Sequence, residues 1–412
     1  MAEDAVAPWD PYAERYDVTL SNDGVWSWFS DARAVHHEAL FDRTFVGWVN
    51  HEGDIQVGTV DHEDRTLMVA TLHQALQADD HANPALLVRA DGRLVAFYSA
   101  HYGTDLFLRV SAAPEDGANW GPELRLGVNT SGPGGYTYAN PVSLPAEGDR
   151  VYLFWRGAND QPSFATSNDG EHFSAARTLF EVPNERPYVK VASDGVGRIH
   201  FALTDGHPRE VTANSIYHFF YEQGAFFRVD GASIGDIGAL PVRPPQADLV
   251  YDASRGGASA WVWDIALDTS GHPVIVYVVL PSEHDHRYQY ARWTGMVWET
   301  HEIVAAGGTI DGPAEPYYSG GIALDHENPG MLYLARETDG VHELERWTTE
   351  DGGATWSSEA LTSGSDATNA RPAAVRGGRC GLVGLFWWSG RYAGYTDYDT
   401  AVRGAFFPSH GD

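Results

Sequence analysis

Two histidines lie at the open end of one predicted β-hairpin. The hairpin runs from His81 through an Asp91-Gly92 turn to His101. The Asp-Gly pair favours a two-residue type I′ turn. Counting outward from that turn sets residue 81 opposite residue 102 and residue 101 opposite residue 82. We therefore expect the two imidazoles side by side where the hairpin opens.

The next hairpin carries a tyrosine and an arginine in the matching places. It starts at Tyr138, turns near residues 147–148 and ends at Arg156. By the same count, Tyr138 takes the place of His81 and Arg156 the place of His101. Groups that can accept a proton, donate a proton and bind a carboxylate thus recur at equivalent points of adjacent repeats, as an active site requires.

This set suits removal of a proton next to a carboxylate. Arg156 would pair with the carboxylate of a uronic acid and stabilise the charge that develops when C5 loses its proton. A neutral His81 or an ionised Tyr138 would take the proton, and the other would protonate the leaving oxygen. Structural roles compete: a strand-end hydrogen bond for His101, an ion pair within a blade for Arg156, and packing for Tyr138.

Apolar hairpins recur along the whole chain and predict the elements that would hold these residues. Their return strands are apolar on both faces, so they are expected to be buried on both faces. The segments between hairpins are more polar, and none has a sustained helical period. The first strands begin near Arg33, Pro84, Pro141, Pro187, Val262, Gly320 and Pro372.

A turn motif repeats in step with the hairpins. Residues 349–356 match the Asp-box, Ser/Thr-x-Asp-x-Gly-x-Thr-Trp, and residues 167–173 and 114–120 are degenerate copies. Weaker copies lie at 222–227 and 293–298. The aspartate caps a turn between outer strands, so we interpret the motif as structural.

These patterns predict an all-β fold: one domain over residues 1–412, a seven-bladed β-propeller of four-stranded antiparallel blades. The ends of the chain should close the ring. Residues 16–20 and 25–29 would complete the last blade, whose own strands include 391–398 and 402–407. In a propeller, the loops that lead into the innermost strands surround one mouth of the central channel, which would gather the four candidate residues.

The composition narrows the possible partners. A net charge of −30 disfavours nucleic acid and anionic membranes. Of the 27 basic residues only Lys190 is a lysine, and so acidic a surface favours a salt-loving source. No stretch approaches the ~18 apolar residues of a membrane span. The start, Met1-Ala-Glu-Asp-Ala, is not a signal peptide, so the protein is cytoplasmic or secreted with its leader removed, and the sequence does not decide which.

Cysteine and histidine spacing gives no metal motif. Cys380 is the single cysteine, which excludes an intramolecular disulfide, and its apolar surroundings indicate a buried strand. A zinc cluster is disfavoured because there is no cysteine pair and no helical His-x-x-x-His. The chemistry needs no cofactor. A structural calcium ion in the channel is possible, and the site's metal content is otherwise unknown.

The hairpins resemble the seven-bladed propeller ulvan lyases, a family of BNR/Asp-box type, with propeller α-L-rhamnosidases as close relatives. The resemblance covers nearly the whole chain and is most specific in the second to fourth blades. The matching segments are Asp79-Asp80-His81-x-Asn83-Pro84, Tyr98-Ser-x-His101, Tyr138-x-Asn140-Pro141, Tyr152-Leu-Phe-Trp-Arg156, Arg186-Pro-Tyr188-Val-Lys190, residues 200–208, residues 317–325 and Trp387-Trp-x-Gly-Arg-Tyr392.

The resemblance implies the roles of these residues. Ulvan lyases cleave between L-rhamnose, often 3-sulfated, and a uronic acid by β-elimination. They use two histidines, a tyrosine and an arginine that neutralises the carboxylate. Carried over, the catalytic residues are His81, His101, Tyr138 and Arg156. The expected substrate-binding residues are Asn83, Asn140, Tyr188, His207 and Arg209.

We therefore predict a polysaccharide lyase that acts on an anionic glycan of the ulvan type or on related rhamnosyl-glucuronate oligosaccharides. An α-L-rhamnosidase that hydrolyses the same linkage is the first alternative. It would use two carboxylates flanking the bond, and none is as clearly placed as the His/Tyr/Arg set. The second alternative is a non-catalytic carbohydrate-binding propeller or a sialidase-like one, for which Arg156, Arg209 and Arg371 could gather around one carboxylate.

Overall fold

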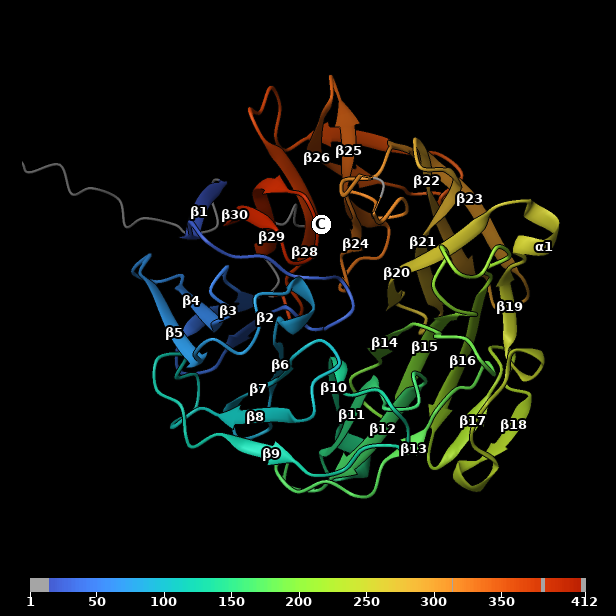
Figure 1. The fold of residues 1–412 in the computed structure, drawn as a ribbon, viewed down its shortest axis with the longest axis horizontal. Helices are drawn as coiled ribbons and strands as arrows, with labels where there is room; N and C mark the ends of the chain where they lie inside the picture. The colour runs from blue at the N-terminus through green and yellow to red at the C-terminus, as the bar shows by residue number, and fades with distance from the viewer. Residues whose placement is uncertain (1–14, 313, 379–381, 409–412) are drawn as a thin grey trace, which may run out of the picture.

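The strands form seven antiparallel sheets arranged around a central axis. This is seen in a computed structural model that describes residues 15–312, 314–378 and 382–408. Each sheet is a blade, and the blades follow one another around the ring in chain order (Figure 1). The predicted all-β, seven-bladed propeller is confirmed. In the described residues no helix is long and apolar enough to cross a membrane.

Each of the first three blades has four strands. Blade 1 holds β2 (Ala34–Glu38), β3 (Asp42–Val49), β4 (Ile55–Asp61) and β5 (Leu67–His73). Blade 2 holds β6 (Ala85–Val88), β7 (Leu94–Ser99), β8 (Leu106–Val110) and β9 (Leu124–Leu126). Blade 3 holds β10 (Thr137–Leu144), β11 (Arg150–Arg156), β12 (Pro162–Ser167) and β13 (Arg177–Thr178).

Blade 4 is larger than the others. Its strands are β14 (Val189–Ser193), β15 (Arg198–Thr204), β16 (Ile216–Glu222), β17 (Ala225–Phe227), β18 (Ser233–Asp236) and β19 (Asp248–Tyr251). The strand β18 extends the sheet beyond β17, and β19 pairs with β16. The segment between His207 and Ser259 thus holds the strands β16 to β19 and the short helix α1 (Ala253–Gly256).

The remaining blades complete the ring. Blade 5 holds β20 (Ser259–Leu267), β21 (Pro273–Ser282), β22 (Asp285–Trp293) and β23 (Trp298–Gly307). Blade 6 holds β24 (Ile322–Leu324), β25 (Met331–Thr338), β26 (Val341–Thr348) and β27 (Ser357–Ala360). Blade 7 holds β28 (Thr368–Ala374), β29 (Leu382–Tyr392), β30 (Tyr398–Pro408) and, as its outermost strand, β1 (Tyr16–Ser21).

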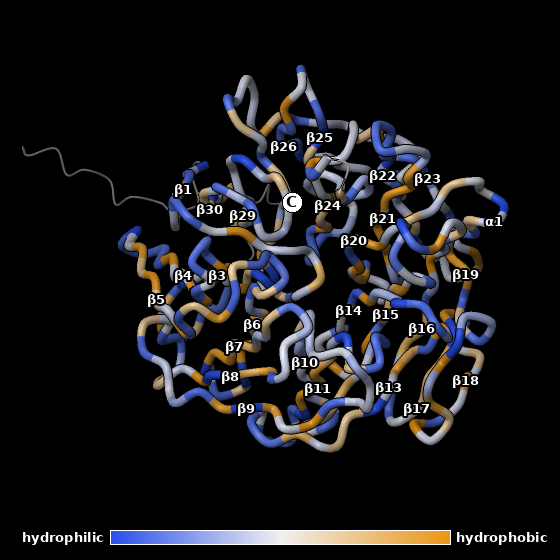
Figure 2. The backbone as a smooth tube through the Cα atoms, viewed as in Figure 1, coloured by the Kyte–Doolittle hydropathy of each residue, from blue (hydrophilic) through white to orange (hydrophobic). Residues whose placement is uncertain are grey.

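The ring is closed by pairing of the first strand with the last, as predicted. Tyr16 pairs with Phe406 along an antiparallel ladder between β1 and β30, and the two strands lie side by side in Figure 1. Of the segment 391–398, expected as a strand, Arg391 and Tyr392 end β29 and Tyr398 begins β30, while residues 393–397 form the bend between them. Figure 2 shows hydrophobic strand segments in the blades and more hydrophilic turns around the outside.

The Asp-box is confirmed as a structural turn between outer strands. It joins β26 to β27, and the Asp351 carboxylate accepts hydrogen bonds from the Thr355 backbone N–H (2.8 Å) and hydroxyl (2.7 Å). The Trp356 indole donates to the Gly353 carbonyl at 3.0 Å. The degenerate copies join β8 to β9 and β12 to β13, where Asp116 and Asp169 each accept backbone N–H bonds.

Residues 25–29 do not form a strand of the last blade. Their alternating aromatic pattern fills the channel instead, where both tryptophans are fully buried. The Trp26 indole donates to the Arg371 carbonyl of blade 7 at 2.9 Å, and the Trp28 indole donates to the Val262 carbonyl of blade 5 at 3.2 Å. Trp28 also stacks on Trp263 with ring centroids 4.2 Å apart. The correction has a physical reason: aromatic rings at alternate positions suit a narrow apolar channel as well as a half-buried strand.

Candidate active site

The two histidines lie as a stacked pair at one mouth of the channel. Their ring centroids are 3.9 Å apart and their planes differ by 6°. The Asp79 carboxylate joins them, with one oxygen 2.6 Å from His81 Nδ1 and the other 3.0 Å from His101 Nδ1. Asp79 also caps the short 3-10 turn Asp80–Ala82 by accepting the His81 backbone N–H. One carboxylate thus fixes the turn and orients both imidazoles.

The predicted hairpin register is wrong by one residue. Ala85 pairs with Phe97 and Val88 with Leu94, so His81 is level with His101 and not with residue 102. The cause is the turn, which has three residues between the Arg89–Arg93 pair and holds Gly92 at φ +78°. A glycine in the left-handed region permits this longer turn with a bulge.

The surroundings of the two imidazoles give them different protonation states. Burial disfavours a charged His81, but the Asp79 and Asp80 carboxylates outweigh it and raise its pKa to about 9. Burial, together with the charge of His81, lowers the pKa of His101 to about 4. At neutral pH His81 is therefore a cation and His101 is neutral. Because His101 Nδ1–H donates to Asp79, its Nε2 carries the free lone pair.

Tyr138 and Arg156 come from blade 3 to the same place. The Tyr138 ring centroid lies 5.3 Å from that of His81. Tyr138 has φ +65° and falls where the β10–β11 register shifts, so a backbone irregularity directs its side chain toward the mouth. Burial and the neighbouring Tyr188 raise the pKa of Tyr138 well above its usual value, against the opposing charge of Arg156. Its hydroxyl is protonated at neutral pH.

Arg156 is buried without an acidic partner among the described residues. The residue is 4% exposed, its Nη2 donates to the Thr137 hydroxyl at 3.3 Å, and its Nε has no hydrogen-bond partner. Its guanidinium carbon lies 4.5 Å from the ring centroid of Tyr102, 5.0 Å from that of Tyr138 and 5.9 Å from that of Tyr188. Cation–π contacts stabilise the charge but leave N–H groups free to bind an anion.

Arg371 has a different role from the one a sialidase-like site would need. It is fully buried and pairs with the Asp80 carboxylate, and it also donates to the Trp26 carbonyl and the Tyr392 hydroxyl. This pair holds Asp80 beside His81. The arrangement of Arg156, Arg209 and Arg371 around one carboxylate is therefore not formed.

Asn83 and Asn140 do not face the mouth as substrate-binding residues were expected to. Both are nearly fully buried and bind the channel segment. Asn83 Oδ1 accepts the Ser27 backbone N–H at 3.2 Å, and Asn140 Nδ2 donates to the Phe29 carbonyl at 2.8 Å. Each anchors an inner strand to residues 25–29.

Tyr188, His207 and Arg209 line the blade 4 side of the mouth, as predicted from their place in the chain. The Tyr188 ring lies 5.9 Å from the ring of His207. Burial and the charges of Arg186, Arg209, Arg156 and His81 all lower the pKa of His207, so this imidazole is neutral. Arg209 Nη1 is 2.6 Å from a carboxylate oxygen of Glu315, which belongs to the segment between blades 5 and 6.

Three further residues of the mouth were missed by sequence reasoning. They are Asp79, which bridges the histidines, Tyr102, whose ring stacks on His101 at 5.0 Å, and Tyr395, whose ring meets His81 edge-on at 5.2 Å. Asp79 had a readable signal, since an aspartate two residues before His81 suits a turn cap. Tyr395 lies in the bend between β29 and β30, far from the repeat positions that were compared.

Two groups of donor atoms in the described residues have the spacing of a metal site. In His36, Asp42 and His62, and again in Asp79, His81 and His101, one ligand atom from each residue lies within 4.8 Å of the others. The second group is accounted for by the hydrogen bonds of both imidazoles to Asp79. Both groups mix nitrogen with oxygen donors, whereas calcium prefers oxygen alone.

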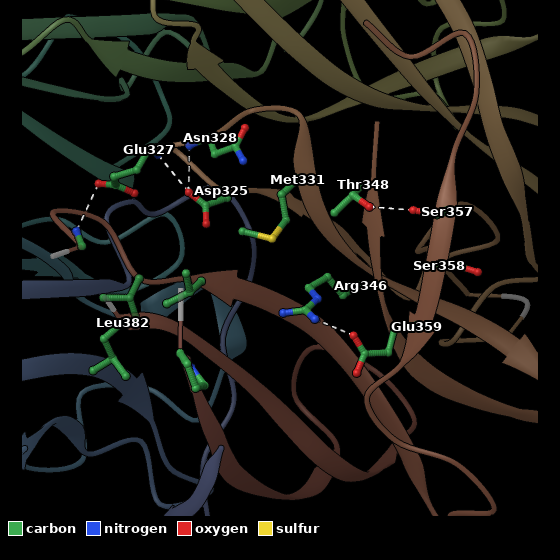
Figure 3. Close-up of a pocket in the computed structure, with 14 residues that line it drawn as sticks. Asp325, Glu327, Asn328, Met331, Arg346, Thr348, Ser357, Ser358, Glu359 and Leu382 are labelled. Carbon is green, nitrogen blue, oxygen red and sulfur yellow. Dashed lines mark hydrogen bonds and ion pairs between the residues drawn. The ribbon is translucent and has the colours of Figure 1, made fainter. Parts of the chain in front are cut away.

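A cavity of about 570 Å³ lies elsewhere, between blades 6 and 7 (Figure 3). It opens by the β24–β25 turn, at the opposite end of the inner strands from the histidine pair. Its Arg346 pairs with Glu359, and the Asp325 carboxylate accepts the backbone N–H groups of Glu327 and Asn328. These charged groups already have partners within the protein, so we place the candidate site at the histidine mouth.

The BNR repeat-containing family model matches residues 43–306. The chain belongs to this family. No curated protein matches this BNR-repeat protein in sequence.

Solved structures share its fold. A PL25 ulvan lyase, a polysaccharide lyase bound to -[GlcA(1-4)Rha3S]-, superposes with a TM-score of 0.71 at 16% identity, over 94% of this chain and 95% of that one. A second structure, of a PL25 ulvan lyase, gives 0.70 at 16% identity and the same coverage. The polysaccharide lyase Uly1 gives 0.55 at 12% identity, over 96% of this BNR-repeat protein and 99% of Uly1. At these identities the likeness establishes the propeller fold.

Proposed function

We propose that the protein is a polysaccharide lyase that cleaves rhamnose–uronate linkages by β-elimination. One observation carries the proposal: a buried guanidinium, with no carboxylate partner among the described residues, lies beside two stacked imidazoles of which one is a cation and the other neutral. The guanidinium supplies a place for a substrate carboxylate, and the neutral imidazole supplies a base. Asp79 holds the two imidazoles in position.

The proposed reaction follows from the protonation states. Arg156 binds the uronate carboxylate and stabilises the negative charge that develops on it. Neutral His101 takes the C5 proton at Nε2. The electron pair of that C–H bond forms the C4=C5 double bond, and the C4–O bond breaks. The leaving oxygen takes a proton from Tyr138 or from the His81 imidazolium. His81 and Tyr138 are both protonated at neutral pH, so we assign the base to His101 and leave the acid to one of the other two.

The substrate class is proposed from chemistry and likeness together. The site needs a carboxylate next to an acidic C–H, which uronic acids provide. A protein of the same fold at 16% identity is an ulvan lyase with -[GlcA(1-4)Rha3S]- bound. We propose an anionic rhamnose–uronate polysaccharide or oligosaccharide for this protein, cleaved without a cofactor.

Hydrolysis of the same linkage is the second candidate, because two carboxyl groups lie near the mouth. Burial raises the pKa of Asp311 to about 6, and burial also raises the pKa of Glu315. A protonated carboxyl could serve as a general acid. Glu315, however, forms an ion pair with Arg209, with 2.6 Å between Glu315 Oε1 and Arg209 Nη1. Elimination is favoured because Arg156 has no acidic partner among the described residues and His101, bonded to Asp79 through Nδ1, keeps Nε2 free to accept a proton.

The deciding experiment is incubation with ulvan and with rhamnosyl-glucuronate oligosaccharides at low and high salt. We expect an unsaturated uronate product, seen as a rise in far-ultraviolet absorbance. Free rhamnose without that absorbance would establish the hydrolase instead. Binding without any product would identify a carbohydrate-binding propeller.

The pH profile of kcat/KM tests the assigned protonation states. The base must be neutral, so activity should appear as the pH rises through about 4, the pKa of His101. If the His81 imidazolium is the acid, activity should fall as the pH rises through about 9; if Tyr138 is the acid, no fall is expected there. Replacing Asp79 by asparagine removes one of the carboxylates that raise the pKa of His81, so the alkaline limb should move to lower pH. An alkaline limb that stays in place in Asp79→Asn would refute the role of His81.

A further inference from the structure

Two more guanidiniums lie beside Arg156 on the blade 4 side of the mouth. Arg186 comes just before β14, and Arg209 follows β15. Arg186 Nη1 donates to the Tyr102 hydroxyl at 3.0 Å, and the face of the same Tyr102 ring covers Arg156. One tyrosine therefore contacts both Arg156 and Arg186.

A surface glutamate lies between these two guanidiniums. Glu210 Oε1 is 3.0 Å from Arg186 Nη2 and 3.8 Å from Arg209 Nη2. The Glu210 side chain is 46% exposed, so its hold on the arginines is weakened by solvent. Arg186 Nε is buried and has no hydrogen-bond partner in the described residues. Arg186 thus keeps an unused donor next to a carboxylate that can leave.

The charges of the three arginines all reach the region around His207. His207 lies close enough to Arg186, Arg209 and Arg156 for each of their charges to lower its pKa. In a chain of net charge −30, such a gathering of cations at a mouth attracts anions. Arg156 accounts for one anionic group of a substrate. Arg209 is paired with Glu315 through Nη1 at 2.6 Å, so its Nη2 and the Arg186 guanidinium remain to be explained.

We propose that Arg186 and Arg209 form a second anion-binding subsite, which Glu210 occupies until a substrate displaces it. The ligand is an anionic substituent on a sugar beside the one held by Arg156, either a sulfate ester or a second carboxylate. The identity of the sugar chain rests on the proposed function, but anion binding itself does not. The internal carboxylate and the substrate anion compete for the same N–H groups.

The proposal predicts that removal of the Glu210 charge strengthens binding. In Glu210→Gln the competing carboxylate is lost, so affinity for a sulfated rhamnosyl-glucuronate disaccharide should rise roughly two- to fivefold. In Arg186→Ala the same affinity should fall by about tenfold. Titration calorimetry on the full chain measures both. Glu181→Gln is the matched control, because Glu181 forms an exposed ion pair with Arg243 at 2.6 Å on the outside of blade 4.

Three saccharides separate the two sources of the anion. If the subsite takes sulfate, the variants change affinity for the sulfated disaccharide and leave the desulfated one unchanged. If it takes a carboxylate, they change affinity for a desulfated tetrasaccharide with two uronates. Unchanged or weaker binding of every anionic ligand by Glu210→Gln would overturn the subsite.

Inorganic sulfate separates this proposal from the lyase proposal. If no saccharide is cleaved but Glu210→Gln still gains affinity for sulfate ions, the subsite stands and the lyase reaction is rejected. If saccharides are cleaved and the variant gains nothing for any anion, the reverse holds. Glu210 is exposed, so its replacement should leave the thermal unfolding midpoint unchanged.

Discussion

Replacement of Arg156 by alanine is expected to lower kcat/KM on a rhamnose–uronate glycan by at least about 10²-fold. The side chain is buried, faces three tyrosine rings and has no carboxylate partner in the described residues. Without it, nothing at that point would stabilise the charge that develops on the substrate carboxylate. Arg156→Lys should recover only part of the loss, because an ammonium group cannot pair bidentately with a carboxylate.

The measurement is the initial rate of absorbance increase at several substrate concentrations. Arg109→Ala is the matched control: Arg109 donates to the Gly121 carbonyl at 3.2 Å on the outer strand β8, away from the mouth. The thermal unfolding midpoint of Arg156→Ala should stay near that of the parent, because the change removes a buried unpaired charge. A rate close to that of the parent in this folded variant would remove Arg156 from the mechanism.

Replacement of His101 by alanine is expected to lower kcat by roughly 10²–10⁴-fold, the usual contribution of a general base. His101 is the imidazole whose pKa is lowered to about 4, and its side chain is 17% exposed, against 5% for His81. It is therefore both neutral and accessible to a substrate. His81→Ala should also abolish turnover, because the cation that shares Asp79 with His101 is then lost.

A substrate deuterated at C5 distinguishes the two histidines. Proton removal should limit the residual rate in His101→Ala, so that variant should show a larger isotope effect than the parent. His73→Ala is the control, since His73 is also a histidine paired with a carboxylate, with Nδ1 2.6 Å from Glu123, but it lies at the end of the outer strand β5. A parent-like rate in His101→Ala would assign the base to another group.

The repeat pattern was sufficient to predict the fold because each inner hairpin can be recognised from its own short stretch of sequence. Apolar return strands and turn residues mark every blade, and the structure places the inner strands where the pattern predicted them. The convergence of His81, His101, Tyr138 and Arg156 followed from their equivalent positions in adjacent hairpins. Both inferences depend on short-range sequence alone.

The remaining features depend on contacts between distant parts of the chain. The charge states of the histidines depend on Asp79, Asp80 and the Arg371 pair brought from blade 7. Tyr395 arrives from the last hairpin bend, and Glu315 from the segment between blades 5 and 6. Asn83 and Asn140 were expected to bind substrate because a motif contains them, but the partner they hold is residues 25–29. No local pattern specifies such partners.

The segment at residues 25–29 makes the seven repeats unequal. It enters from the edge strand of blade 7 and bonds through side chains or backbone to blades 1, 2, 3, 4, 5 and 7. A propeller can gain or lose a unit only if its hub adapts to the new diameter. Here residues 25–29 fill the centre of the ring and fit a channel of one diameter. A change in the number of blades would therefore also change the geometry of the histidine mouth.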